Sequence, residues 1–137
     1  MILKGIICER LKTDETFFTD SHPYFTTRSK VILPEVSIPL TTNFNFDSSS
    51  IIGFIQPNDI CDDGDCIKFK AIVTDESAKS WLRSLNDIRV GGYYTNVVTS
   101  DKDPLIVESA KLMAISICKN GFYKAEVDDK EIKYGIK

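Results

Sequence analysis

The sequence predicts a mainly β domain, in which a small antiparallel-rich sheet closes into a barrel or packs as a sandwich and carries one main helix. Short apolar runs separated by turn residues recur along the chain and indicate about eight strands. Only one segment shows a helical period. The chain of 137 residues is long enough for one hydrophobic core. We therefore expect a single domain over residues 1–137.

Composition argues against several classes of protein. The chain is 42% apolar and 27% charged, as is usual for a globular protein, and its net charge of −3 offers no positive field to attract nucleic acid. The apolar runs are far shorter than the roughly 20 residues that cross a bilayer. Residues 1–7 have the pattern of a strand and lack the regions of a signal peptide. We expect synthesis in the cytosol, with no membrane or nucleic-acid partner.

The four cysteines carry no metal-site signature. Cys8, Cys61, Cys66 and Cys118 contain no C-x-x-C pair, so we expect no structural zinc and no cofactor. Cys8 and Cys118 lie in apolar strand patterns and are expected to be small core residues. Cys61 and Cys66 flank a turn, but a disulfide between them is not expected after cytosolic synthesis.

The first third of the chain contains a strand and a long polar segment. Residues 2–8 are β-branched and apolar, as in a central strand. Residues 11–30 lack a clean period and are expected to form a long loop or excursion, whose length indicates a function or a partner contact. Its aromatic residues have two interpretations: they contact a partner, or they cover the domain's own sheet. These aromatics are Phe17, Phe18, Tyr24 and Phe25.

The middle of the chain predicts strands and an acidic turn. Residues 31–33 and 36–38, followed by Pro34 and Pro39, suit edge strands. Residues 51–55 and 66–73 are expected to form a hairpin. Residues 62–65, with the sequence Asp-Asp-Gly-Asp, lie between them and are expected to form a solvated turn, since the remaining ligands of a calcium loop are missing.

The predicted helix covers residues 76–86, and Thr74 or Asp75 caps it. One apolar stripe is expected to pack on the sheet. The members of that stripe are Ala78, Trp81, Leu82 and Leu85. Trp81 is expected to be a core anchor.

Strands return after the helix. Residues 88–98 are extended, and Gly91-Gly92 predicts a bulge or a close approach of neighbouring backbone. Residues 105–107 and 112–118 are two further strands. Asn120-Gly121 predicts a tight hairpin that pairs the strand ending at Lys119 with residues 122–127. A final short strand is expected over 132–136.

Six stretches occur in an order that resembles a known family. Residues 39–47 (PLTTNFNFD) are followed by three serines and by IIGF at 51–54, then by the strand 67–73, the helix 76–86 and VGGY at 90–93, and finally by LMAISIC at 112–118. This order resembles the prohead (maturation) proteases of tailed phages, which are related in fold to herpesvirus assemblins. The resemblance covers about residues 38–118, and residues 11–30 lack the family's Pro-Gly-Ala-Phe-like stretch.

The resemblance implies that the catalytic positions are vacant. Phe46 stands where the family has its histidine, Val90 where it has the nucleophilic serine, and Ala114 where it has the acidic residue. None of these side chains can attack a carbonyl, accept a proton or orient an imidazole. The only histidine, His22, lies outside the matched region, and Ser116 lies in an alternating apolar strand. We therefore expect no enzymatic activity.

The function that the resemblance implies is structural. We expect an auxiliary or decoration protein of a phage virion that binds the capsid shell, with the major capsid protein or other virion proteins as partners and a homo-oligomer left open. Three alternatives remain. The chain is an internal scaffold or head-assembly factor, or an active maturation protease with a rearranged site, or an unrelated small β domain that matches by chance.

Overall fold

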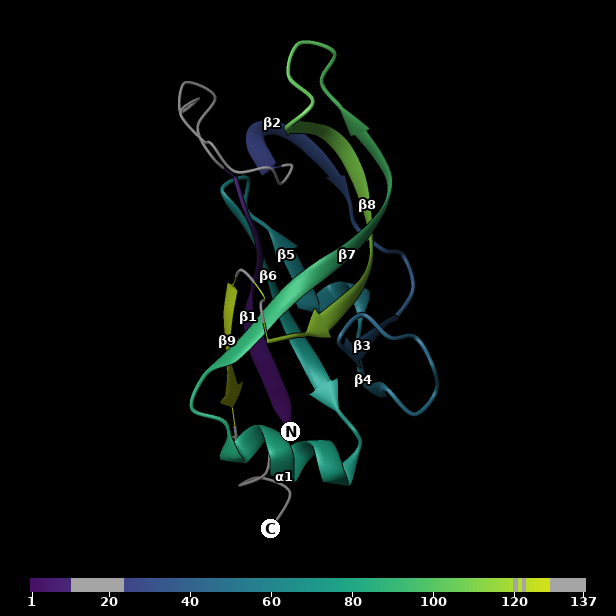
Figure 1. The fold of residues 1–137 in the computed structure, drawn as a ribbon, viewed down its shortest axis with the longest axis vertical. Helices are drawn as coiled ribbons and strands as arrows, with labels where there is room; N and C mark the ends of the chain where they lie inside the picture. The colour runs from purple at the N-terminus through teal and green to yellow at the C-terminus, as the bar shows by residue number, and fades with distance from the viewer. Residues whose placement is uncertain (11–23, 120, 122, 129–137) are drawn as a thin grey trace.

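The computed structural model describes residues 1–10, 24–119, 121 and 123–128. The strands of this part of the chain form one sheet, and seven of them close into a barrel in the order β1-β9-β7-β8-β3-β4-β6, where β6 pairs with β1 again (Figure 1). β5 extends the sheet from β6, and β2 adds to β8. The strands are β1 (Ile2–Glu9), β2 (Tyr24–Ile32), β3 (Ile38–Thr42), β4 (Ile51–Ile55), β5 (Ile60–Asp62), β6 (Cys66–Val73), β7 (Ile88–Thr99), β8 (Ile106–Ile117) and β9 (Tyr123–Asp128). The predicted mainly β fold with one main helix is confirmed.

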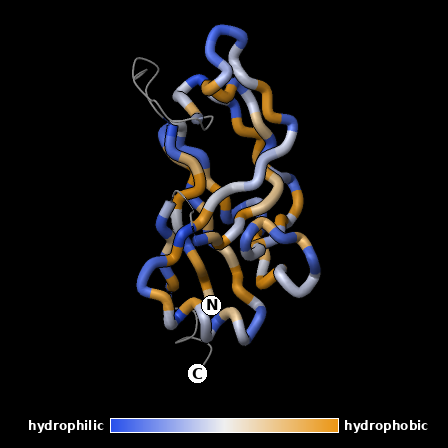
Figure 2. Tube along the Cα trace, in the orientation of Figure 1, coloured by the Kyte–Doolittle hydropathy of each residue, from blue (hydrophilic) through white to orange (hydrophobic). Residues whose placement is uncertain are grey.

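The core fills the barrel because side chains alternate along each strand. In β6, Ile67 and Phe69 are buried in the core while Lys68 and Lys70 are exposed. Figure 2 shows the same contrast at a larger scale, with hydrophobic residues along the barrel strands and hydrophilic residues in the connections. The period of two that predicted this strand therefore also assigns its faces.

One α-helix, α1 (Glu76–Ser84), lies across the lower end of the barrel in Figure 1. The Asp75 carboxylate caps it by accepting a hydrogen bond from the Ala78 amide at 2.9 Å. Ala78 and Leu82 are buried, but Trp81 is 42% exposed, so the expectation that Trp81 anchors the core is wrong. A residue one position before Leu82 lies about 100° away around the helix. The buried stripe is too narrow to include it. No helix in the described part of the chain has the length and apolarity needed to cross a membrane.

The segment predicted as an excursion is partly a strand. Residues 24–30 belong to β2, which pairs in parallel with β8, while residues 11–23 lie outside the described residues. The predicted hairpin partner of β6 is also different. β5 forms the hairpin with β6 across the acidic turn, whereas β4 pairs mainly with β3 and reaches β6 only through Gly53 and Phe54.

The hairpin predicted at Asn120-Gly121 does not form in the described residues. β9 pairs with β7 and β1 instead of β8. β8 has no free hydrogen-bonding edge, because it pairs with β7 on one side and with β2 and β3 on the other. The bulge predicted at Gly91-Gly92 occurs farther along, between Tyr93 and Tyr94. The close approach of backbone that was the alternative is wrong, since the atoms nearest to a Cβ at these glycines belong to the side chains of Phe44 and Tyr94. The strand predicted over 132–136 lies outside the described residues.

Two tyrosines replace strand pairing where β9 ends. β9 pairs with β1 only as far as Gly5. Beyond that point the Tyr94 hydroxyl donates to the Ile7 carbonyl at 3.3 Å, and the Glu9 amide donates to the Tyr123 hydroxyl at 3.1 Å. These bonds satisfy backbone groups that would otherwise lack partners at the gap between β1 and β7.

Candidate functional site

Three exposed aromatic side chains gather on the outer wall of the barrel. Phe44 and Phe46, in the turn between β3 and β4, are 40% and 43% exposed, and Tyr93 of β7 is 39% exposed. The rings of Phe46 and Tyr93 lie edge to face with their centroids 5.0 Å apart, a favourable geometry for aromatic pairs. We call Phe44, Phe46 and Tyr93 the aromatic patch. It is a preformed apolar surface on a rigid sheet.

A glycine on β7 makes room for the patch. The ring of Phe44 lies over Gly91, and a Cβ atom at Gly91 would come within 3.2 Å of the Phe44 Cζ atom. That distance is shorter than ordinary van der Waals contact, so a larger residue would displace the ring. Gly91 therefore allows the turn to lie flat against β7.

The turn is held in an unusual backbone conformation. Asn43 and Phe44 have φ angles of 51° and 54°, in the left-handed region that phenylalanine rarely adopts. The Phe44 amide donates to Ser116 Oγ at 2.8 Å, and the Thr41 hydroxyl donates to the Asn45 carbonyl. Backbone bonds add to these, since the Asn43 amide donates to the Ile117 carbonyl at 2.9 Å. Several bonds together offset the cost of the left-handed residues.

Ser116 is a positioning residue for this turn. Its side chain is fully buried, and its hydroxyl accepts the Phe44 amide and makes a longer contact of 3.4 Å with the Ile117 carbonyl. His22 lies outside the described residues. Within the described ranges the Ser116 hydroxyl has a structural partner on each side.

The three positions that the resemblance singled out do not converge. Phe46 contacts Tyr93, and Ala114 is the cross-strand neighbour of Tyr93, so these two positions lie around one residue on the outer wall. Val90 lies three residues before Tyr93 with no register shift between them, so its side chain points to the opposite face. Val90 is fully buried in the barrel core. A hydroxyl at this position would face the core and not the patch.

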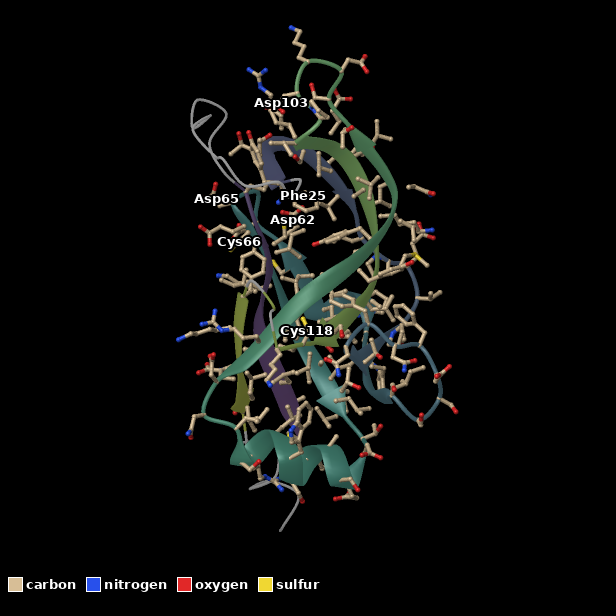
Figure 3. All side chains as sticks on the ribbon, viewed as in Figure 1. Phe25, Asp62, Asp65, Cys66, Asp103 and Cys118 are labelled. Atoms are coloured by element: carbon tan, nitrogen blue, oxygen red, sulfur yellow. The ribbon has the colours of Figure 1, made fainter. Side chains whose placement is uncertain are left out.

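The four aromatic residues predicted to contact a partner or cover the sheet do not form one exposed group in the described residues. Phe25 packs against the core, with its ring centroid 5.0 Å from that of Tyr94, and Tyr24 is half-buried. Phe17 and Phe18 lie outside the described residues. Phe25 thus covers the domain's own sheet, near Asp62 at the upper end of the barrel in Figure 3. The sequence analysis did not single out Phe44 and Tyr93 as contact residues. For Phe44, a signal was available in the Asn-Phe-Asn-Phe sequence of residues 43–46, because asparagine favours turns and a turn at the surface leaves its large side chains exposed.

A partly buried ion pair lies near the same end of the barrel. The Arg10 guanidinium donates to both carboxylate oxygens of Asp62 at 2.5 and 2.8 Å, and its Nε atom donates to the Ser29 carbonyl at 3.3 Å. The hydrogen bonds from Arg10 hold the pKa of the Asp62 carboxyl below its usual range. Burial raises the pKa of the nearby Cys8 thiol to about 12, which makes that thiol unreactive.

The carboxylates of the acidic turn, residues 62–65, accept hydrogen bonds from the backbone of the same turn. Asp63 accepts hydrogen bonds from the amides of Asp65 and Cys66, and these bonds lower the pKa of its carboxyl. Gly64 has a φ of 94°, which requires glycine. All four cysteines are free thiols. Across the described ranges no three ligating side chains are grouped so as to hold a metal ion.

No family model matches this chain, no curated protein matches its sequence, and no solved structure matches its fold. The aromatic patch is therefore interpreted from its own geometry.

Proposed function

We propose that this chain is a non-enzymatic structural protein of a tailed-phage particle, an auxiliary or decoration protein that binds the capsid shell through the aromatic patch. The observation that carries this proposal is the patch itself. Three large rings are held in fixed positions on the barrel wall, although burying them within the domain would lower the free energy of the folded chain. A protein partner is the surface that would cover them.

The patch has the physical properties of an interface centre. Aromatic side chains dominate binding energy at protein interfaces, and rigid rings lose little entropy on binding. Covering the exposed two fifths of each ring contributes about 1 kcal/mol, on the scale of roughly 2–3 kcal/mol for a fully buried phenylalanine. The bonds from Ser116 and Thr41 hold the turn before any partner arrives. Preorganisation of this kind reduces the cost of association.

The choice of a capsid partner comes from the resemblance to prohead proteases, which act on capsid components. Two of the family's catalytic positions, Phe46 and Ala114, lie beside Tyr93 in the patch. Phe46 is exposed and apolar, which favours contact with a partner surface over peptide-bond chemistry, whereas Ala114 is buried. Val90 does not join them, so the proposal depends on the patch and not on a reconstructed triad.

Co-sedimentation with capsids tests the proposal. Purified chain is mixed with tailed-phage capsids assembled without it, and the bound fraction is measured for the unchanged protein, for Phe46→Ala and for Trp81→Ala. Trp81 is a matched control, because it is an equally exposed aromatic residue on α1. We expect Phe46→Ala to weaken binding by about fivefold, the equivalent of the roughly 1 kcal/mol that covering this ring contributes, and Trp81→Ala to leave it unchanged. Equal binding by both variants contradicts the proposal.

Mass spectrometry of finished particles separates the alternatives. A decoration protein remains in the mature virion, whereas a scaffold or assembly factor is found in proheads and is absent from finished particles. A rearranged protease would cleave capsid precursor and lose that cleavage in Ser116→Ala or His22→Ala. Cleavage with this dependence overturns the proposal.

A further inference from the structure

A second surface of the barrel forms a groove lined by lysines. It runs across β6, β1 and β9, has a volume of about 450 Å³, and does not include the aromatic patch. Its lining residues are Lys4, Gly5, Ile6, Lys68, Phe69, Lys70, Lys124, Ala125 and Glu126. Four lysines and one glutamate give this lining a surplus of three positive charges, on a chain whose net charge is −3. Positive charge is therefore concentrated here.

Strand register explains the shape of the groove. Phe69, Gly5 and Ala125 form one row across the three strands, and Phe69 points into the core, so this row presents backbone to the outside. The rows on either side carry outward side chains and form the walls. Those rows contain Lys70, Lys4 and Glu126 on one side, and Lys68, Ile6 and Lys124 on the other. The walls are two residues apart along each strand, which is about 7 Å.

Two of the four lysines are not neutralised by described residues. Lys4 pairs with Glu126 at 3.7 Å and Asp128 at 3.5 Å, and Lys68 pairs with Asp63 at 3.9 Å. Lys70 and Lys124 make no ion pair with any described residue. They lie on the two outer strands with β1 between them and on opposite walls, about 10 Å apart across the sheet and about 7 Å along it, which makes about 12 Å in all. Both long side chains can therefore reach one ligand from opposite sides.

The acids around the groove limit what can bind. Asp63 lies at the β6 end, and Glu126 and Asp128 lie at the β9 end. A long polyanion that ran past either end would meet these carboxylates and be repelled. A short extended peptide with acidic residues two positions apart places its carboxylates on one face about 7 Å apart, within the groove.

We propose that the groove between Lys70 and Lys124 binds a short acidic segment of a partner protein. Lys70 and Lys124 each pair with one carboxylate, and the half-buried backbone of Gly5, which has no side chain, lets the segment approach the sheet. This contact is separate from the aromatic patch and does not depend on the proposed capsid function. Its charge complementarity predicts binding that weakens with salt.

The test uses the intact chain and a blocked tripeptide, acetyl-Glu-Ala-Glu-amide, followed by backbone NMR shifts. We expect the amides of Gly5, Ile6 and Lys124 to shift on titration, and the shifts to weaken when salt is raised from about 0.05 M to about 0.5 M. The corresponding Gln-Ala-Gln peptide should cause none. The double variant Lys70→Gln with Lys124→Gln should weaken binding about tenfold.

A matched double variant controls for total charge. Lys30→Gln with Lys102→Gln removes two positive charges from exposed lysines outside the groove and should leave binding unchanged. Equal losses in the two double variants, or no shifts in the groove at saturating peptide, overturn the proposal. Tighter binding of a single-stranded oligonucleotide than of the acidic peptide also overturns it, because the acids at both ends would then fail to exclude a polyanion.

Discussion

Replacing Ser116 by alanine tests whether the aromatic patch is held from beneath. Ser116 is fully buried, and its hydroxyl accepts a hydrogen bond from the Phe44 amide at 2.8 Å. The variant removes that hydroxyl. Loss of a partner for a buried donor costs about 1–3 kcal/mol, and the lower part of that range applies because this bond is partly buried. The left-handed conformation of Phe44 adds about 1–2 kcal/mol of strain that this bond helps to offset. We expect Ser116→Ala to lower the free energy of unfolding by about 1–2 kcal/mol.

Urea denaturation and amide hydrogen exchange measure the effect. In thermal unfolding, each kcal/mol of lost stability lowers the Tm of a chain of 137 residues by about 3–5 °C. Exchange of the Phe44 amide should accelerate about tenfold, the equivalent of roughly 1.4 kcal/mol. The control is Ser109→Ala, also on β8, whose half-buried hydroxyl makes no hydrogen bond with described residues. Unchanged exchange at Phe44 in Ser116→Ala would refute the role assigned to this serine.

Two further predictions concern the end of the barrel that holds Arg10 and Asp62. Asp62→Asn should lower stability by about 2 kcal/mol at pH 7, because it leaves the Arg10 guanidinium without its charge partner. The pKa of Asp62 is depressed in the folded state, so the pair stabilises the fold above the unfolded pKa of about 4, and this advantage is lost as pH falls through the folded pKa. Urea titrations should show the two proteins converging at acid pH; a constant difference down to pH values well below 4 would contradict this. At mild alkaline pH, iodoacetamide should label the exposed Cys61 in the native protein but label Cys8 only as fast as the chain unfolds, since burial raises the Cys8 pKa to about 12. Peptide mapping checks this, and rapid native labelling of Cys8 would show that it is accessible.

Local patterns were sufficient for many elements. The alternation in β6 predicted both the strand and its buried face, and Asp75 capped the helix as expected. Both features depend on residues that are close together in the sequence, so the local sequence is enough to predict them. The predicted turn at 62–65 also forms, because Gly64 supplies the positive φ that it needs.

Pairing between distant strands was harder to predict. Asn120-Gly121 is a strong local hairpin signal, but local chemistry does not reveal that β8 already has neighbours on both edges. The prediction that Trp81 is buried was wrong for a similar reason. The helical period places Trp81 next to the buried side of α1, but it does not say how wide a strip of the helix surface the barrel covers.

The sequence by itself determined that this chain is mainly β with one helix, and which face of its regular strands is buried, because those properties follow from periodicity and local turn chemistry. Only the tertiary structure decided that Phe46 meets Tyr93, that Phe44 lies over Gly91, and that Val90 points to the opposite face of the sheet. It also decided that lysines from three strands line one groove. Such neighbours are set by sheet order and register, which depend on the packing of the whole barrel.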